Sequence, residues 1–248
     1  MNKSKTKIGF SKIGGIFIGK NIQSDYHKHY AVSIIISFGK PFKITTDKQK
    51  QYNCKVAKIQ KNITYKLESD NNENTVFIHI VPYSDNGIKL SNKSKPVQKY
   101  DIQLFENILS KLKDWFNNSE NDPKVIKSLL NEISLIADSP QQEKSKIDER
   151  IKRSFDLIMQ NENEKLPIAD IASSVYLSSS HFARLFKKET GMTFRKFVLH
   201  SKLVKSIYSM YQNNNLTEAS FMGGFADQPH FSRTFKNAFG IKPSKSRE

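Results

Sequence analysis

The sequence is short of cysteine and of long apolar runs. Cys54 is its single cysteine among 248 residues, which excludes an internal disulfide and fits a reducing compartment. It lies in a strand-like run, so we expect a buried thiol. No segment reaches the roughly 18 apolar residues of a membrane span, and no apolar stretch of signal-peptide type follows the basic N-terminus. We therefore expect a cytoplasmic protein, associated with the nucleoid, and no membrane partner.

Motifs of the common catalytic chemistries are also absent. The sequence has no glycine-rich phosphate loop, no zinc-spaced set of Cys and His, and no Gly-x-Ser-x-Gly turn. These absences argue against an enzyme. We assign no catalytic residue, no cofactor and no metal ligand.

Positive charge is in excess along the whole chain. The sequence carries 40 Lys and Arg against 24 Asp and Glu, a net charge of +16, which favours polyanionic partners. From residue 147 onward there are 16 basic and 10 acidic residues, so most of the excess lies before this point. Charge alone therefore does not locate a binding site.

A near-duplicate occupies the C-terminal part of the chain. Residues 181–191 recur as residues 230–240, with His, Phe, Arg, Phe, Lys and Gly at equivalent places. Such a repeat indicates a duplicated supersecondary unit. The aromatic residues lie three to four apart in each copy, which predicts a helix with one buried stripe. A generic helical repeat protein fits less well, because solenoids need three or more repeats.

A shorter helical pattern precedes each copy. In the first copy the apolar positions are Ile168, Ile171, Ala172 and Val175, at the spacing of one helix face. Residues 216–225 align with this pattern, and a short turn follows in both copies. The expected caps are Ser178 or Ser179, Gly191, Asp227 and Gly240. Both copies are therefore predicted to be helix-turn-helix units.

The predicted helices present small, hydrogen-bonding and basic side chains opposite the buried stripe. These are Ser180, Ala183, Arg184 and Lys187 in the first copy, and Pro229, Ser232, Arg233 and Lys236 in the second. A helix that lies in the major groove of DNA needs such a face. Arg184 and Arg233 are equivalent, and each side chain can take a guanine edge with two hydrogen bonds.

Residues 147–248 resemble the DNA-binding domain of AraC/XylS-type bacterial transcriptional regulators. Residues 202–210 stand where that family shows Arg-Leu-x-x-Ala-x-x-Leu-Leu, and residues 240–247 match Gly-x-x-Pro-Ser-x-Tyr-Arg except for Ser246. The resemblance implies two helix-turn-helix units joined by a long helix, here over residues 194–212. At about 25 Å, this helix can place the units on neighbouring turns of one DNA face, which repeat every 34 Å or so.

The resemblance also assigns residues within the helices expected at 179–189 and 228–238. Base contacts are implied for Ser180, Ala183, Arg184, Gln228, His230 and Arg233. Phosphate contacts are expected for Ser179, Lys187, Lys188, Ser232 and Lys236. We expect a structural role for His181 beside the buried Phe182. For His230 a structural role and a base contact both stay open.

Three positions depart from the family pattern in and after the second unit. Ser220 replaces the usual Ala, Gly223 the usual Val, and Ser246 the usual Tyr. Each change removes apolar packing. We therefore expect the second unit to be the less stable one and its sequence contribution to be smaller.

The first hundred residues have a different texture. β-branched runs at 31–38, 54–59, 63–67 and 75–81 are separated by Gly, Pro, Asn or Asp, which predicts an antiparallel barrel or sandwich. The segment around Gly19, residues 27–29 and residues 38–42 resembles the cupin-like domain of many of these regulators. The expected class is α+β: a cupin-like antiparallel β-barrel with a helical pair, then an all-α domain.

His27 and His29 lie two residues apart, so on a strand both would point the same way, as metal ligands must. A cupin metal site would also need a Glu a few residues later, and none occurs between residues 30 and 66. Glu68, Glu73 and His79 are the remaining candidates. We favour a structural or pocket-lining role for the histidines.

Residues 100–137 switch to helical periodicity. The apolar positions are Ile102, Phe105, Ile108, Leu109, Leu112, Trp115, Phe116, Val125, Ile126, Leu129, Leu130, Ile133 and Ile136. The resemblance implies a helical pair that packs on the barrel and forms a dimer interface; packing within one monomer is the alternative. Residues 1–137 are thus expected as a sensing and dimerisation domain, 138–146 as a linker and 147–248 as the DNA-binding domain.

These observations predict a sequence-specific DNA-binding transcriptional regulator, and the resemblance to the AraC/XylS-type family implies an activator. Its implied partners are double-stranded DNA, RNA polymerase, a small-molecule effector in the N-terminal domain and a second copy in a homodimer. Two alternatives remain. One is a cupin-type enzyme with a metal held by His27, His29 and His79; the other is a sequence-neutral nucleoid-binding protein. The sequence does not reveal the effector, the operator or the target genes.

Overall fold

The computed structural model describes residues 6–69, 74–91, 95–118, 122–138, 147–160, 166–212 and 214–246. Its contacts divide the chain into two compact units, Met1–Lys144 with Phe235–Glu248, and Ser145–Thr234. Residues 139–146 of the expected linker lie outside the described residues. The last residues of the expected DNA-binding domain, from Phe235, cluster with the strands.

The first unit contains two antiparallel sheets. The larger one has the order β1 (Lys7–Ser11), β2 (Gly14–Gly19), β9 (Thr75–Ile80), β4 (Val32–Ser37), β7 (Val56–Ile59), β10 (Val97–Tyr100). The smaller one has the order β3 (His27–Lys28), β8 (Thr64–Glu68), β5 (Phe42–Thr46), β6 (Gln51–Cys54). The strand pairing of the described residues forms two antiparallel sheets and shows no closed barrel. The arrangement is compatible with a cupin-like sandwich.

The burial of strand β4 on both faces explains the continuous β-branched run in its sequence. All six of its residues are buried: Ile34 belongs to the core cluster that contains the helices, while Ile35 belongs to the cluster between the two sheets. A strand buried on both faces reads as a continuous β-branched run. The predicted strands at 31–38, 63–67 and 75–81 are confirmed, and the run at 54–59 becomes β7 after a break at Lys55.

Cys54 is the last residue of β6 and is only half-buried, contrary to the expected buried thiol. It lies on the smaller sheet, whose strand β6 alternates exposed and half-buried residues because this strand is the edge of the sheet. Partial burial still raises the pKa of its thiol to about 11. The thiol is therefore protonated and unreactive at neutral pH.

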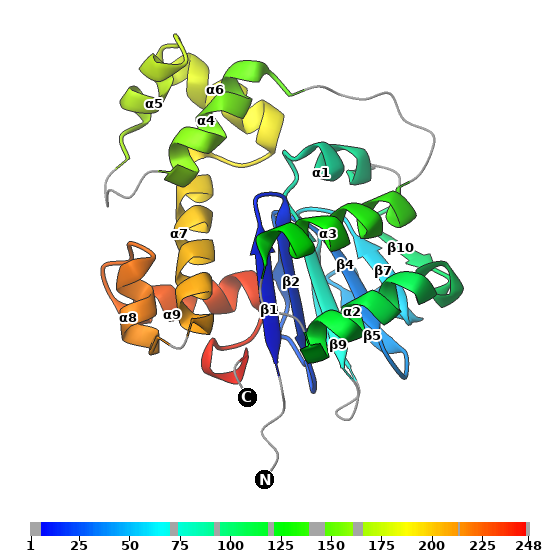
Figure 1. Cartoon of the computed structure of the whole chain (residues 1–248). Helices are drawn as coiled ribbons and strands as arrows, with labels where there is room; N and C mark the ends of the chain where they lie inside the picture. The colour runs from blue at the N-terminus through cyan, green and yellow to red at the C-terminus, as the bar shows by residue number, and fades with distance from the viewer. Residues whose placement is uncertain are drawn as a thin grey trace. The chain divides into compact units, whose positions relative to one another are not determined.

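Helices cover one face of the larger sheet. Helix α1 (Asp85–Leu90) lies in the chain between β9 and β10, and the 3₁₀ turn η1 (Ile102–Phe105), α2 (Glu106–Asn118) and α3 (Pro123–Ala137) follow β10. Figure 1 shows α2 and α3 lying across the sheet. The apolar stripe expected at a dimer interface mostly packs here, with Phe105, Leu112 and Trp115 at most 1% exposed. Packing within the monomer therefore uses that stripe. Leu104, Val125 and Leu135 remain exposed.

The three histidines of the proposed metal site lie together between the strands. Nε2 of His27 is 3.0 Å from Nε2 of His29, and Nδ1 of His79 is 3.1 Å from the Ser33 hydroxyl. Glu68 lies near Lys43 and Lys66 instead, and Glu73 is outside the described residues. Within the described ranges no group of three or more His, Cys, Asp or Glu could hold a metal ion. The ring nitrogens of His27 and His29 contact each other, as in a structural histidine pair.

Acid is expected to destabilise the protein through His27. Its Nδ1 donates to the Asp25 carbonyl at 2.8 Å, so its Nε2 accepts a hydrogen bond from Nε2 of His29 at 3.0 Å. Desolvation lowers the pKa of His27 below its ordinary value, against the opposing effect of Asp25. Because the folded-state pKa is lowered, this contribution to stability is fully present above the unfolded pKa of about 6.5 and is lost as the pH falls below that value and through the folded-state pKa.

Urea unfolding at pH 7.5, 6.5 and 5.5 measures this loss. We expect the unfolding midpoint to fall with pH in the wild type and to fall less in His27→Gln, which cannot take up the proton. His181→Gln serves as the control because His181 is exposed. Identical pH dependences for the wild type and His27→Gln would contradict the assignment.

The second compact unit, Ser145–Thr234, is helical. Its elements are α4 (Glu149–Gln160), α5 (Ile168–Ser174), α6 (Ser179–Thr190), α7 (Phe194–Tyr211), α8 (Leu216–Met222) and the first part of α9 (Gln228–Phe239), whose last turn clusters with the first unit. A short 3₁₀ turn, η2 (Ser244–Ser246), follows α9. Rings of Phe155, Phe186 and Phe197 lie 5.2 to 5.8 Å apart and form the core of the first helical group. None of the helices described is both long and apolar enough to cross a membrane.

Candidate nucleic-acid interface

The first helix-turn-helix unit comprises α5, a turn and α6. The amide of Tyr176 donates to the Ser173 carbonyl (3.0 Å) and the amide of Leu177 to the Ala172 carbonyl (2.9 Å), which is the Schellman pattern of a helix C-terminus. The hydroxyl of Ser178 then accepts from the His181 amide as the N-cap of α6. Gly191 ends α6 with φ 78°. The predicted caps of this unit are confirmed.

The second helix-turn-helix unit, α8 and α9, has the same turn and the same kind of helix caps. The amide of Gly224 donates to the Phe221 carbonyl (2.8 Å) and that of Phe225 to the Ser220 carbonyl (2.9 Å). The Asp227 carboxylate accepts from the His230 amide at 2.6 Å. Gly240 follows α9 with φ 71°. The duplication visible in the sequence is thus a duplication of turn geometry.

Helix α7 joins the two units. It has 18 residues and is therefore about 27 Å long, close to the predicted length. Figure 1 shows α4, α5 and α6 at its N-terminal end and α8 with α9 at its C-terminal end. Lys202 of α7 donates to the Gly224 carbonyl at 2.6 Å, which fastens the turn of the second unit to the connecting helix. Burial lowers the pKa of His200, also on α7, to about 4.

The three residues that depart from the family pattern in and after the second helix-turn-helix unit fit their surroundings in the structure. Ser220 is fully buried and its hydroxyl donates to the Thr217 carbonyl at 2.7 Å. Ser246 belongs to the first compact unit, which contains the strands. It is buried, and its hydroxyl donates to the Pro243 carbonyl at 2.7 Å. At Gly223 an added Cβ would lie 2.7 Å from the Lys202 carbonyl, so glycine allows α7 and α8 to approach. The structure thus gives each of these residues a local role, and the lower stability expected for the second helix-turn-helix unit stays a prediction.

Helix α6 buries its aromatic stripe and exposes its basic one. Phe182 and Phe186 are fully buried. The residues predicted to contact bases or phosphates lie on the outer side: Ser180, Arg184, Lys187 and Lys188 are exposed, and Ser179 and Ala183 are half-buried. His181 is exposed too, because it lies on the first turn of the helix, clear of the buried aromatic stripe. We expected His181 to have a structural role beside the buried Phe182, and its exposure contradicts this expectation.

Helix α9 also buries its aromatic side chains and exposes its basic ones. Phe231 and Phe235 are buried, whereas Arg233, His230 and Lys236 are exposed. Three of the predicted contact residues on α9 have partners within the chain. Gln228 donates to the Ser232 hydroxyl at 2.9 Å along the helix, and Lys236 lies 3.1 Å from the Asp25 carboxylate, within the first unit.

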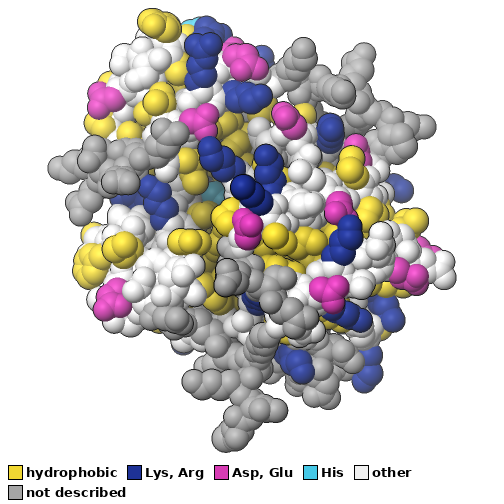
Figure 2. All heavy atoms as spheres, in the orientation of Figure 1, with side chains coloured by type: hydrophobic (Ala, Val, Ile, Leu, Met, Phe, Trp, Pro, Cys, Tyr) yellow, Lys and Arg dark blue, Asp and Glu magenta, His cyan; other side chains and the backbone are white. Residues whose placement is uncertain are grey.

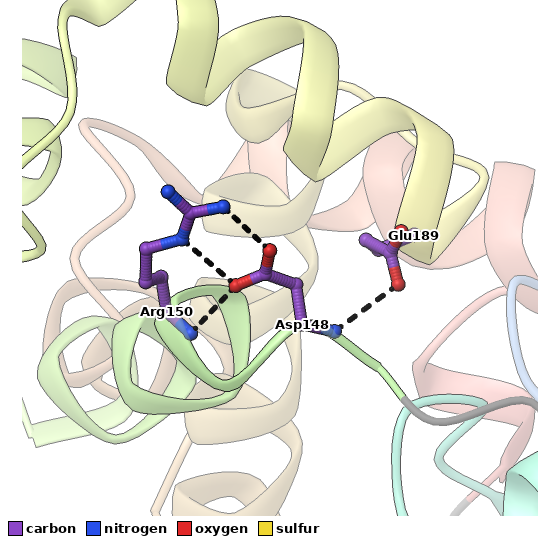
Figure 3. A network of polar contacts seen from close by, with 3 residues as sticks. All are labelled: Asp148, Arg150 and Glu189. Atoms are coloured by element: carbon purple, nitrogen blue, oxygen red, sulfur yellow. Dashed lines mark hydrogen bonds and ion pairs between the residues drawn. The ribbon is translucent and has the colours of Figure 1, made fainter.

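A polar network fixes the start of α4 against α6 (Figure 3). The Asp148 carboxylate accepts from the Arg150 side chain at 2.7 and 3.0 Å and from the Arg150 amide at 2.9 Å. These hydrogen bonds lower the pKa of Asp148 to about 2. The Asp148 amide donates to Glu189 of α6 at 3.3 Å. The network therefore links the end of α6 to the first helix of the unit.

On the face of the molecule drawn in Figure 2, Lys and Arg side chains are interspersed with acidic and apolar ones. The duplicated arginines therefore locate the candidate interface better than the net charge does.

Sequence reasoning overlooked one prominent residue of this surface. Tyr176 has φ 58° and is 91% exposed. The signal was available in the repeat alignment, since Gly224 occupies the equivalent position of the second unit.

Comparison with known proteins supports the helix-turn-helix assignment. A family model described as a helix-turn-helix domain matches residues 166–248. The Msm operon regulatory protein of Streptococcus mutans is 36% identical over 85 residues, which are 34% of this chain and 30% of that protein. The transcriptional activator RhaS of Yersinia pestis is 27% identical over 99 residues, 40% of this chain and 36% of that protein. The chain spans about a third of the length of these curated relatives in the matched region. Its C-terminal part is a helix-turn-helix domain of AraC/XylS type.

The similarity to solved structures extends over the whole chain. ToxT from Vibrio cholerae O395 superposes with a TM-score of 0.61 at 15% identity, covering 100% of this chain and 98% of that one. A second ToxT structure, with a bound unsaturated fatty acid, has a TM-score of 0.57 at 15% identity over 100% and 96% of the two chains. At this identity the likeness shows the fold: an α+β chain with N-terminal antiparallel sheets and a C-terminal helical domain.

Proposed function

We propose that this protein is a sequence-specific DNA-binding transcriptional regulator, and more specifically an activator, that reads two adjacent major-groove segments with α6 and α9. The observation that carries this proposal is the pair Arg184 and Arg233. Both side chains are exposed at equivalent positions of two units with the same turn hydrogen bonds. A monomer with two such units can contact two segments of one DNA face.

Within this proposal the residues divide into two groups by chemistry. Ser180, Ala183, Arg184, Gln228, His230 and Arg233 contact base edges. The hydroxyls and amines of Ser179, Lys187, Lys188, Ser232 and Lys236 contact phosphates. Ala183 offers a methyl group to a thymine methyl. Gln228 and Lys236 would exchange their present partners, Ser232 and Asp25, for DNA.

The proposed partners beyond DNA concern the whole protein. RNA polymerase is the partner of an activator, and a homodimer would present four helix-turn-helix units. Because the Phe105 to Ile133 stripe is mostly in the core, a dimer formed through these helices would use the exposed Leu104, Val125 and Leu135. A small-molecule effector of the strand unit is proposed by analogy with ToxT, one of whose structures holds an unsaturated fatty acid.

Selection of preferred sites from random DNA with the full-length chain tests the proposal. We expect enrichment of a site with two specified segments about one helical turn apart, roughly 10 base pairs. The same protein should bind the selected site at least about 10³-fold more tightly than random DNA. Recovery of no preferred sequence, with uniform salt-dependent binding, would replace the proposal by sequence-neutral binding.

A further inference from the structure

The turn between α5 and α6 contains a tyrosine where the chain's own repeat has glycine. Tyr176 and Gly224 make the same two-bond Schellman turn, at hydrogen-bond lengths of 2.8 to 3.0 Å. Both residues have left-handed backbones, with φ 58° for Tyr176 and φ 81° for Gly224. Glycine adopts this conformation without a steric cost, whereas a bulky L-residue rarely does.

The fold obtains no visible packing from this tyrosine. Its side chain is 91% exposed, and no large hydrophobic side chain in the described part of the chain is more so. An aromatic ring in solvent adds little to stability, while its backbone is strained. An unfavourable conformation that contributes nothing to packing is a reason to look for an external partner.

The position of Tyr176 suggests which partner this is. Only Leu177 separates it from Ser178, the N-cap of α6. The N-terminal residues of a recognition helix are those that reach base edges, so the residue just before this helix lies close to the sugar-phosphate strand beside the groove. A tyrosine hydroxyl is a regular donor to phosphate.

We propose that Tyr176 contacts the sugar-phosphate backbone of DNA at the segment bound by the first unit. The contact rests on the proposed role of α6. It is confined to the first unit, because Gly224 has no side chain to make it in the second. As a backbone contact it adds affinity on every sequence and does not discriminate between bases.

Three variants of the full-length protein separate this role from a structural one. Tyr176→Gly removes both the strain and the contact. Strain relief outweighs the entropy that glycine adds to the unfolded chain, so the melting temperature should rise by about 2 to 5 °C, while DNA affinity falls roughly tenfold. Tyr176→Phe keeps the strain and the ring. Its melting temperature should stay unchanged and its affinity should fall about fivefold, since only the hydroxyl is lost. Gly224→Ala introduces the same strain in the second unit and should lower the melting temperature.

Affinity is measured on the selected site and on random DNA at several salt concentrations. The proposal expects both affinities to fall together. It is overturned if Tyr176→Gly binds as tightly as the wild type, or if Tyr176→Phe equals the wild type and Tyr176→Gly loses affinity only together with stability. Failure of the wild type to prefer any sequence would instead reject the proposed function, since the backbone contact acts on random DNA as well.

Discussion

Arg184→Ala is expected to relax the sequence preference within one groove segment and to leave the other segment unchanged. The guanidinium of Arg184 is exposed on α6, opposite the buried Phe182 and Phe186, and can donate two parallel hydrogen bonds to a guanine edge. Its loss should cost about 1 to 3 kcal/mol of discrimination at that position. Site selection with the variant, compared with the wild type, shows which segment becomes degenerate.

Arg233→Ala should relax the second segment, about one helical turn away. The sequence alone predicted a smaller effect here, because Ser220, Gly223 and Ser246 seemed to weaken the second unit. Since Ser220 and Ser246 are hydrogen-bonded and Gly223 serves a close approach, that reason no longer holds. We now expect the two losses to be comparable.

Lys187→Ala is the matched control for both arginine variants. Lys187 is exposed one turn after Arg184 on the same helix, but a lysine that holds a phosphate carries no sequence information. Its removal should weaken binding to all sequences alike and reduce the salt slope by about one unit. Unchanged site preferences in both arginine variants would leave only electrostatic or shape-based binding.

The sequence predicted the helical unit well because its signals are local. Caps such as Ser178, Asp227 and Gly191 act within one turn of the helices that they end, and the spacing of Phe182 and Phe186 defines a face directly. The strand unit was predicted less completely. Strand β3 has two residues and β6 is an edge strand, so neither leaves a period of two long enough to recognise.

What the sequence could not predict depends on distances between elements. The Phe105 and Leu112 stripe has the same pattern whether it packs on a sheet or on a second copy, and only the fold decides between the two. The histidine pair was recognisable as a pair, but its 3.0 Å contact is a consequence of the fold. The left-handed backbone of Tyr176 is not predicted by the tyrosine itself, and the only sequence signal for it is the glycine at the equivalent position of the repeat, Gly224.

Gly223 shows how a distance reverses an interpretation. Judged by the family pattern, glycine in place of valine removes packing, so restoring a side chain should stabilise the second unit. In the structure an added Cβ would lie 1.8 Å from the Ser206 hydroxyl oxygen and 2.7 Å from the Lys202 carbonyl oxygen. The hydroxyl can rotate, but the carbonyl belongs to the backbone of α7 and cannot move without displacing that helix.

Gly223→Ala is therefore expected to destabilise the protein by about 2 to 3 kcal/mol, the usual cost of overpacking, and Gly223→Val by more. Ser206→Ala is the control: its hydroxyl is buried and has no hydrogen-bond partner within the described part of the chain, so its removal should be neutral or stabilising by about 1 kcal/mol. In the double variant the clash with the hydroxyl oxygen disappears, whereas the close approaches to the Lys202 carbonyl and to Cβ of residue 206 remain. The double variant should therefore be more stable than Gly223→Ala and less stable than Ser206→Ala. Urea unfolding followed by circular dichroism measures all three variants. A Gly223→Ala protein as stable as the wild type would show that α7 and α8 can separate freely, and that the family pattern was the better guide to this position.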